Sequence, residues 1–235
     1  MLAFNYTIRR SQRAKKTRII VTPEKIEVVA PLGVSEQVIH NFVKDHKTWV
    51  EVTSQKVKLR KKNIKRIAPV NYNNEALVPF RGDQVRIKLE QVLSLNKIKI
   101  ELDKENEFII VVPKSNHNSD LIRLALIEWM KKQAYKDVED YIELYANKYN
   151  LYPRNVRIKT QKSRWGSCGI HNDININWLL ILAPPEVLAY VVVHELCHIK
   201  ERNHSARFWQ LVEAHFPTYQ KQRKWLKQNG GGLAL

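Results

Sequence analysis

Residues 189–204 read AYVVVHELCHIKERNH, and this stretch decides how the chain is interpreted. His194 and His198 are four residues apart, which places them about 40° apart on one face of an α-helix. Two imidazoles so arranged can bind one zinc ion, and Glu195 beside them can accept a proton from a water molecule at the metal. His204 follows His198 by six residues and can supply a third nitrogen. Three imidazoles leave a ligand position open, which is typical of a catalytic zinc site.

The motif has a structural alternative, in which both histidines are core residues of a buried helix. The apolar run AYVVV before His194 is compatible with that alternative. However, a charged glutamate between two core histidines would be costly to bury. A chain with this histidine and glutamate content contains roughly 0.02 HExxH matches by chance. We therefore predict one catalytic Zn²⁺ held by His194, His198 and His204, with Glu195 as the catalytic residue.

Around the motif, segments whose apolar residues have the spacing of a helix alternate with segments that have the spacing of a strand. Apolar spacing predicts a long helix from about 121 to 149, and Pro184-Pro185 opens a helix that we expect to reach Arg202. Further expected elements are strands at 155–160 and 173–182, a glycine-containing loop at 162–169, and helices at 205–215 and 217–228. This half of the chain is thus expected to mix helices and strands.

The first half of the chain is richer in strands. Short β-branched or alternating runs predict strands at 4–10, 17–22, 25–31, 76–80, 84–90, 97–102 and 107–113. Ser35 is the expected N-cap of one helix, which fades into a basic run at 56–66. A polar break at 114–119 is the expected domain boundary. The prediction is an α+β chain with a β-rich N-terminal domain at 1–115 and an α+β domain at 116–235.

Composition limits the cellular setting and the partners. The chain has 235 residues, with 40 Lys and Arg against 23 Asp and Glu, a net charge of +17. Two cysteines cannot form a disulfide scaffold, so we expect a cytoplasmic protein. We find no signal peptide and no apolar run near the roughly 18 residues of a membrane span, so no membrane partner is expected. Basic runs at 9–18 and 56–66 allow an anionic substrate or nucleic acid, although such runs are often solvated surface.

Four residues before and within the strand at 173–182 are candidates for substrate binding. Arg164 can bind a carboxylate or phosphate or stabilise an oxyanion, or it can form a structural salt bridge. Trp165 can stack on a substrate, although packing in the core is the commoner use of a tryptophan. Asn175 and Asn177 alternate along the strand, so they can line a groove or complete hydrogen bonds at a sheet edge.

Several stretches together resemble a known family. SRWGSC, ININ, the double proline and YVVVHELCHIKERNHSARFW are similar to the YgjP-type family of predicted metal-dependent hydrolases, relatives of the WLM and SprT-like zincin metallopeptidases. RRSQRAKKTRIIV, EVVAP, HFPTY and KWLK extend the resemblance over nearly the whole chain. The resemblance implies a zincin-like hydrolase domain at 116–235, with the three histidines as zinc ligands and Glu195 as general base. Glu201 replaces the turn glycine of metzincins, so that class is not assigned.

Three functions remain open on the sequence alone. The first is a zinc metallopeptidase acting on a peptide or protein, held along the strand at 173–178. The second keeps the metal but hydrolyses a phosphoanhydride such as a nucleoside triphosphate, which the charge, Lys162 and Arg164 favour. The third is a protease-like module associated with nucleic acid, for which salt-dependent DNA binding would be the evidence.

Overall fold

The computed structural model describes residues 3–63, 67–92, 97–113, 118–161 and 163–235. The chain divides into two compact units, an N-terminal unit at Met1–Lys65 and a C-terminal unit at Arg66–Leu235. This division differs from the expected boundary between residues 115 and 116. Residues 114–117, where that boundary was expected, lie outside the described residues.

The N-terminal unit is a small sheet with two helices. Its elements are β1 (Thr7–Arg10), β2 (Arg18–Val21), β3 (Ile26–Ala30), α1 (Glu36–Asp45) and α2 (Lys47–Asn63). β3 lies in the middle of the sheet, parallel to β1 and antiparallel to β2. Val28, Ala30, Ile39 and Val43 form its buried core.

The expected single helix after Ser35 is two helices. Ser35 is the N-cap of α1 as expected, since its side chain accepts a hydrogen bond from the Val38 N–H. α1 then ends at Asp45, His46 is its C-cap residue, and α2 begins at Lys47. The described part of the basic run at 56–66 therefore lies on α2, whereas residues 64–66 lie outside the described residues.

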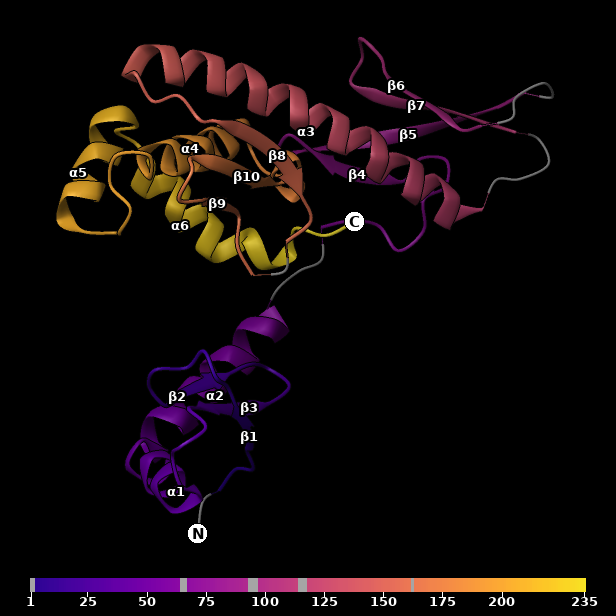
Figure 1. The fold of residues 1–235 in the computed structure, drawn as a ribbon. Coiled ribbons are helices and arrows are strands. Elements are labelled where there is room, and N and C mark those ends of the chain that lie inside the picture. Colours follow the sequence, from indigo (N-terminus) through magenta and orange to yellow (C-terminus); the bar gives the residue numbers. More distant parts are fainter. Residues whose placement is uncertain (1–2, 64–66, 93–96, 114–117, 162) are drawn as a thin grey trace. The chain divides into compact units, whose positions relative to one another are not determined.

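The C-terminal unit begins with a sheet in the order β4-β5-β7-β6. Its strands are β4 (Leu77–Phe80), β5 (Asp83–Val92), β6 (Lys99–Leu102) and β7 (Glu107–Pro113). β5 and β7 are parallel, and the other pairs are antiparallel. Helix α3 (Ser119–Tyr149) follows, and it runs past this sheet and the next one (Figure 1).

Aromatic packing explains why residues 67–113 belong to the C-terminal unit. Phe80 on β4, Phe108 on β7 and Trp129 on α3 contact one another, with ring centroids 5.3–5.6 Å apart. These contacts join strands on one side of the expected boundary to a helix on the other side. They belong to one hydrophobic core that continues to Leu233. The sheet and the helix bury their apolar faces on each other, so they form one folding unit.

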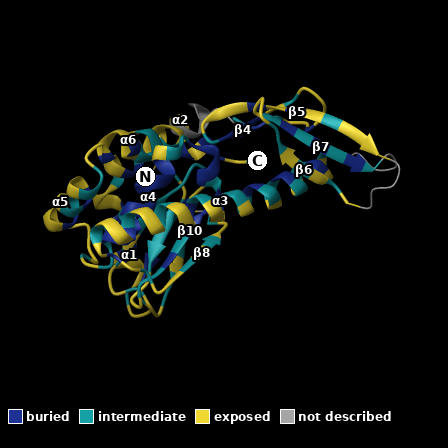
Figure 2. Ribbon diagram, turned by 90° about the horizontal axis from the view of Figure 1, so that it is seen from above, coloured by how far each residue is buried: buried dark blue, intermediate teal, exposed yellow. Residues whose placement is uncertain are grey.

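Helix α3 buries one face along its length. Its fully buried residues include Ile122, Leu126, Met130, Ala134 and Val138, at intervals of four. Buried and exposed residues therefore alternate along the helix (Figure 2). No helix among the described residues is long and apolar enough to cross a membrane.

The remaining elements surround the sequence motif. They are β8 (Asn155–Lys159), β9 (Gly166–Cys168), β10 (Asp173–Asn177), the 3₁₀ helix η1 (Trp178–Leu182), α4 (Pro185–Cys197), α5 (Ala206–His215), α6 (Tyr219–Asn229) and the 3₁₀ helix η2 (Gly230–Gly232). The sheet order is β8-β10-β9, with β8 parallel and β9 antiparallel to β10. The α+β fold class is confirmed. Two details differ from expectation: the strand expected at 173–182 ends at Asn177, and the expected loop at 162–169 contains β9.

Candidate active site

Helix α4 carries the first two residues of the motif and ends before the second histidine. The helix is almost wholly buried, from Val187 to Cys197, with His194 half-buried on it. It ends at Cys197 rather than at Arg202, and His198 is its C-cap residue. A turn follows, in which the N–H of Ile199 donates to the Leu196 carbonyl. Because the chain turns back here, His204 lies close to His194 and His198.

The structure brings the three predicted ligands together. The Nε2 atoms of His194 and His204 are 3.0 Å apart, and one ring nitrogen of each histidine lies within 4.8 Å of the others. His198 Nδ1 is 2.9 Å from the Glu201 carbonyl. When Nδ1 donates a proton to that carbonyl, Nε2 keeps its lone pair. A backbone carbonyl is a usual partner for the second nitrogen of a metal-binding histidine.

The chemistry of these donors fits a zinc ion. Two ligands at about 2.0–2.1 Å from a tetrahedral zinc are about 3.3 Å from each other, close to the distance between the two Nε2 atoms. Burial, with the charges of His198, His204 and Arg223, lowers the pKa of His194 to about 3. Burial also lowers the pKa of His198, although its hydrogen bond to Glu201 opposes this. Both imidazoles are therefore neutral near pH 7, as a metal ligand must be.

Glu195 lies beside the histidines, buried and with one free oxygen. Its residue exposure is 5%, and its Oε2 has no hydrogen-bond partner among the described residues. The Cys168 N–H donates to the carboxylate, and Gly166 packs directly against it. Burial raises the pKa of Glu195 to about 8, while the charge of Arg164 and the Cys168 hydrogen bond oppose the rise. A carboxylate with such a raised pKa is suited to accept and return a proton near neutral pH.

The four residues proposed for substrate binding lie in different surroundings. Asn177 is buried, and its amide donates to the carbonyls of Gln161 and Arg164 and caps η1. The polar atoms of the Asn177 side chain thus connect the backbone before β9 to the start of η1. Asn175 donates to Ser167 Oγ on β9. Neither asparagine lines the pocket beside Glu195.

Arg164 and Trp165 are closer to the motif. Arg164 is exposed, and its charge acts on Glu195. Trp165 is half-buried and lines a cavity of about 330 Å³ that also contains His194 and Glu195. Its ring packs so tightly on Gly230 of η2 that a Cβ there would lie 2.8 Å from it. Trp165 therefore both packs in the core and borders the cavity.

Arg202 connects the segment before His204 to the turn after β9, and it was not among the predicted site residues. It donates to the Gly169 carbonyl at 2.8 Å, to the Ile170 carbonyl at 3.4 Å, and to Asn172 Oδ1. These bonds fix the segment between His198 and His204. Nothing in the sequence distinguishes Arg202 from the other surface arginines.

Two cations on α6 also reach the site and were not expected. Arg223 and Lys227 border the same cavity as Trp165 and Glu195. Both belong to a helix whose sequence has basic residues at many positions. Their spacing of one turn is also common on solvated helices, so the sequence alone gave no reason to select them.

A sequence model of a protein family, described as YgjP-like, metallopeptidase domain, matches residues 15–229. With the geometry above, this match defines the chain as a metal-dependent hydrolase of the metallopeptidase type. It belongs to the YgjP-like family.

One curated relative and two solved structures are similar to parts of the chain. The UTP pyrophosphatase of Escherichia coli (strain K12) is 32% identical over 91 residues, 36% of this chain and 54% of the relative, so the match spans about half of the relative's length. The metallopeptidase zymogen abylysin of Pyrococcus abyssi is 25% identical, covering 39% of this chain and 97% of its own, with a TM-score of 0.35. The zymogen of jannalysin from Methanocaldococcus jannaschii is 21% identical, covering 39% and 94%, also with a TM-score of 0.35.

Proposed function

We propose that this chain is a zinc-dependent hydrolase in which His194, His198 and His204 hold the metal and Glu195 is the general base. The observation that carries the proposal is the cluster of three imidazoles, with donor atoms within 4.8 Å of one another, beside a buried carboxylate. When bound, a zinc ion makes water more acidic and polarises the group to be cleaved.

Glu195 can move the proton that hydrolysis requires. Its Oε2 has no hydrogen-bond partner in the described part of the chain, so this atom can accept a proton from the attacking water. The Cys168 N–H and the Gly166 backbone hold the rest of the carboxylate in place. Because its neutral form is accessible near pH 7, the carboxyl can then donate the proton to the leaving group.

The first candidate substrate is a peptide, which the membership of a metallopeptidase family supports. The expected peptide-binding strand, β10, is the central strand of its sheet, whereas β9 is at an edge. Trp165 and Gly169 form backbone hydrogen bonds with β10. In an antiparallel pair only every second residue forms such bonds, so the backbone N–H and C=O of Gly166 point away from β10. We propose that an extended peptide pairs with β9 at Gly166, next to Glu195.

The second candidate substrate is a phosphoanhydride, as in a nucleoside triphosphate. The name of the relative from Escherichia coli, UTP pyrophosphatase, favours it. The positive charges of Arg164, Arg223 and Lys227 around Glu195 also favour it. Both candidates use the same metal and the same base. Because Cys168 and Cys197 are free thiols, we place either activity in the reducing cytoplasm.

The proposal is tested by measuring metal content and hydrolysis on the same preparations. We expect close to one zinc per chain, and Glu195→Gln should keep the zinc but lose about 10²–10⁴-fold in turnover, because an amide cannot accept the proton. His198→Ala should lose the zinc, whereas His171→Ala, at an exposed histidine, should keep both properties. The loaded protein is assayed with a peptide library and with nucleoside triphosphates. An active Glu195→Gln variant would contradict the general-base role.

A further inference from the structure

The cavity beside Glu195 is lined by more basic than acidic side chains. Residues from β9, α4 and α6 line it, and these elements lie next to one another (Figure 1). Among the described residues that line it, Arg223 and Lys227 are basic and Glu195 alone is acidic. The cavity thus joins the general base to two cations contributed by another helix.

The positions of the two cations are set by α6. They are four residues apart, so they lie on one face of the helix, one turn from each other. The guanidinium of Arg223 lies over the ring of Trp209, 4.4 Å from its centroid. Trp209 in turn stacks on the ring of His204, with centroids 5.6 Å apart. Arg223 is therefore ordered by a stack that begins at a candidate metal ligand.

Neither cation has a carboxylate partner among the residues that the structure describes. Within the part of the chain that the structure describes, no ion pair joins Arg223 or Lys227 to an acidic side chain. An arginine that is ordered on an aromatic ring and keeps its N–H donors free is well suited to bind an oxyanion. The aromatic rings of Trp165 and Tyr190 form apolar walls of the same cavity.

We infer that Arg223 and Lys227 form a subsite that binds an anionic group of the substrate, a carboxylate or a phosphate, next to Glu195. This inference rests on the proposed hydrolase, because it places the subsite relative to the general base. It goes further by requiring a negative charge on the substrate close to the bond that is cleaved. A neutral substrate would leave both cations without a partner in the cavity.

The subsite is tested by binding, which requires no turnover. Inorganic pyrophosphate is titrated into the metal-free full-length protein by calorimetry, so that binding cannot be due to zinc. We expect Arg223→Ala to weaken binding at least about tenfold, about 1.4 kcal/mol, and Lys227→Ala to weaken it several-fold. Arg223→Lys should restore part of the affinity, because it keeps the charge but not the planar set of donors.

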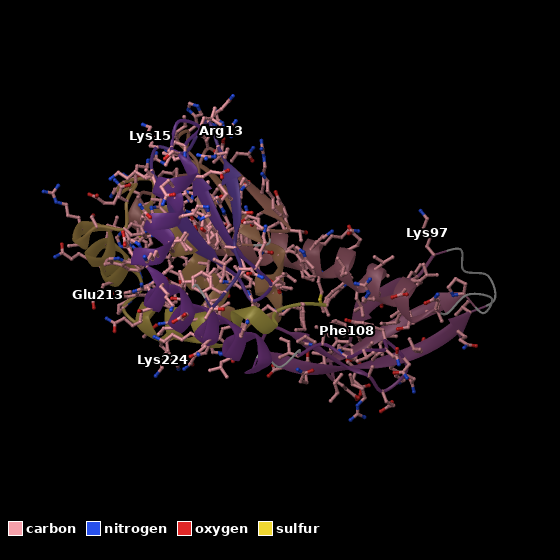
Figure 3. All side chains as sticks on the ribbon, turned by 90° about the horizontal axis from the view of Figure 1, so that it is seen from below. Arg13, Lys15, Lys97, Phe108, Glu213 and Lys224 are labelled. Carbon is pink, nitrogen blue, oxygen red and sulfur yellow. The ribbon has the colours of Figure 1, made fainter. Side chains whose placement is uncertain are left out.

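The control is Lys224→Ala, a neighbouring lysine on α6 that does not line the cavity. Its side chain is exposed and extends away from the ribbon (Figure 3). This variant lowers the net charge as much as Lys227→Ala does, so it measures the effect of charge alone. If Lys224→Ala and Arg223→Ala weaken binding equally, or if wild-type protein does not bind pyrophosphate at 50 mM salt, the inference is wrong.

Competition identifies the source of the anionic group. Displacement of pyrophosphate by UTP, with an affinity that falls in Arg223→Ala, assigns the subsite to a phosphate. Displacement by a dipeptide with a free carboxyl terminus, but not by its amide, assigns the subsite to a carboxylate. If neither compound competes, the subsite does not serve the substrate and the inference fails. Zinc content of the same variants is measured separately, so that failure of the metal site is distinguished from failure of the subsite.

Discussion

Gly166 on β9 lies directly against the carboxylate of Glu195. A Cβ at position 166 would lie 2.5 Å from Glu195 Oε1 and 2.7 Å from its Cγ, closer than real atoms approach. Glu195 cannot easily yield, because it is buried on α4 at the end of an apolar helix. Because position 166 has no side chain, it leaves room for the carboxylate of Glu195, which we propose as the general base.

We predict that Gly166→Ala lowers turnover at least about tenfold, a part of the 10²–10⁴-fold that a general base contributes. The zinc content should stay near that of the wild type, because the three atoms nearest to a Cβ at position 166 all belong to Glu195 and not to a histidine. Turnover and zinc are measured on the same preparation. Gly169→Ala is the matched control, since a Cβ there meets its nearest atom, the Asp173 carbonyl, at an ordinary 3.6 Å. Full activity of Gly166→Ala would show that Glu195 is not held at this contact.

Arg202 provides a second prediction, about metal affinity. Without its bonds to Gly169 and Asn172, the segment that carries His204 loses its attachment to the β9 turn. We expect Arg202→Ala to weaken zinc binding about tenfold, as loss of a supporting group commonly does. Competition with a chromogenic chelator measures the affinity. Arg207→Ala, at an exposed arginine on α5, should leave it unchanged. Equal affinities for the two variants would remove Arg202 from the supporting groups.

Local signals predicted much of this fold. The side chain of Ser35 caps α1 as expected from its residue type. The apolar spacing along α3 and the double proline before α4 located both helices. The spacing of His194, His198 and His204 predicted three residues that the structure brings together. Each of these features depends on residues close in sequence, which is why the sequence alone was sufficient.

The elements and the boundary that differ from the prediction depend on interactions between residues far apart in sequence. β9 is three residues long and contains a glycine, so its strand conformation depends on pairing with β10. The apolar residues of 173–182 continue past Asn177 without a turn signal. The cap that the Asn177 side chain provides to Leu179 shows where the strand ends. The unit boundary depends on the packing of Phe108 on Trp129, which no local pattern contains.

The cysteines give a prediction about reactivity. Cys197 is fully buried, and burial raises its pKa to about 12, so its thiol should not react in the folded protein. Cys168 is half-buried, and burial raises its pKa too, although Arg202 opposes this. We expect slow alkylation of Cys168 alone by iodoacetamide at pH 7, and alkylation of both after denaturation. Mass spectrometry of the intact protein counts the adducts. An adduct on Cys197 in the native state would contradict the buried position of α4.

The ion pair between Arg154 and Asp173 predicts a pH-dependent stability. Two hydrogen bonds, of 2.9 and 2.5 Å, join the side chains, and those bonds lower the pKa of Asp173. Above about pH 4, the ordinary pKa of an aspartate, Asp173 is ionised in both the folded and the unfolded state, and the ion pair stabilises the fold fully. As the pH falls, the unfolded state takes up the proton first, so the stabilisation is lost through the lower pKa of the folded state.

Arg154→Ala should therefore lower Tm at pH 7, and the difference from wild type should shrink as the pH falls below about 4. Thermal unfolding followed by circular dichroism at pH 7, 5 and 3 measures both proteins. Lys159→Ala, at an exposed lysine on β8, removes the same charge without breaking the pair. A difference in Tm for Arg154→Ala that persists unchanged at pH 3 would show that the pair acts through packing rather than through ionisation.

The basic run at 56–66 gives the last prediction, which concerns nucleic acid. Seven of its eleven residues are positive, and a second basic run lies at 9–18, where Arg13 and Lys15 extend away from the ribbon (Figure 3). If these runs form a binding face, the protein should bind duplex DNA without sequence preference and lose affinity steeply with salt.

Neutralising four positive residues in 56–66 should reduce the salt slope by up to about 3–4, since each lost duplex phosphate contact contributes about 0.9. Fluorescence anisotropy at several salt concentrations measures the slope. The control for charge alone neutralises four lysines on α3, namely Lys131, Lys132, Lys136 and Lys148. It should change the slope little if the binding face lies in the N-terminal unit. Zinc content should stay the same in both variants. Because releasing counterions drives such binding, a wild-type titration without binding at 50 mM salt would leave the positive charge without a role in nucleic-acid recognition.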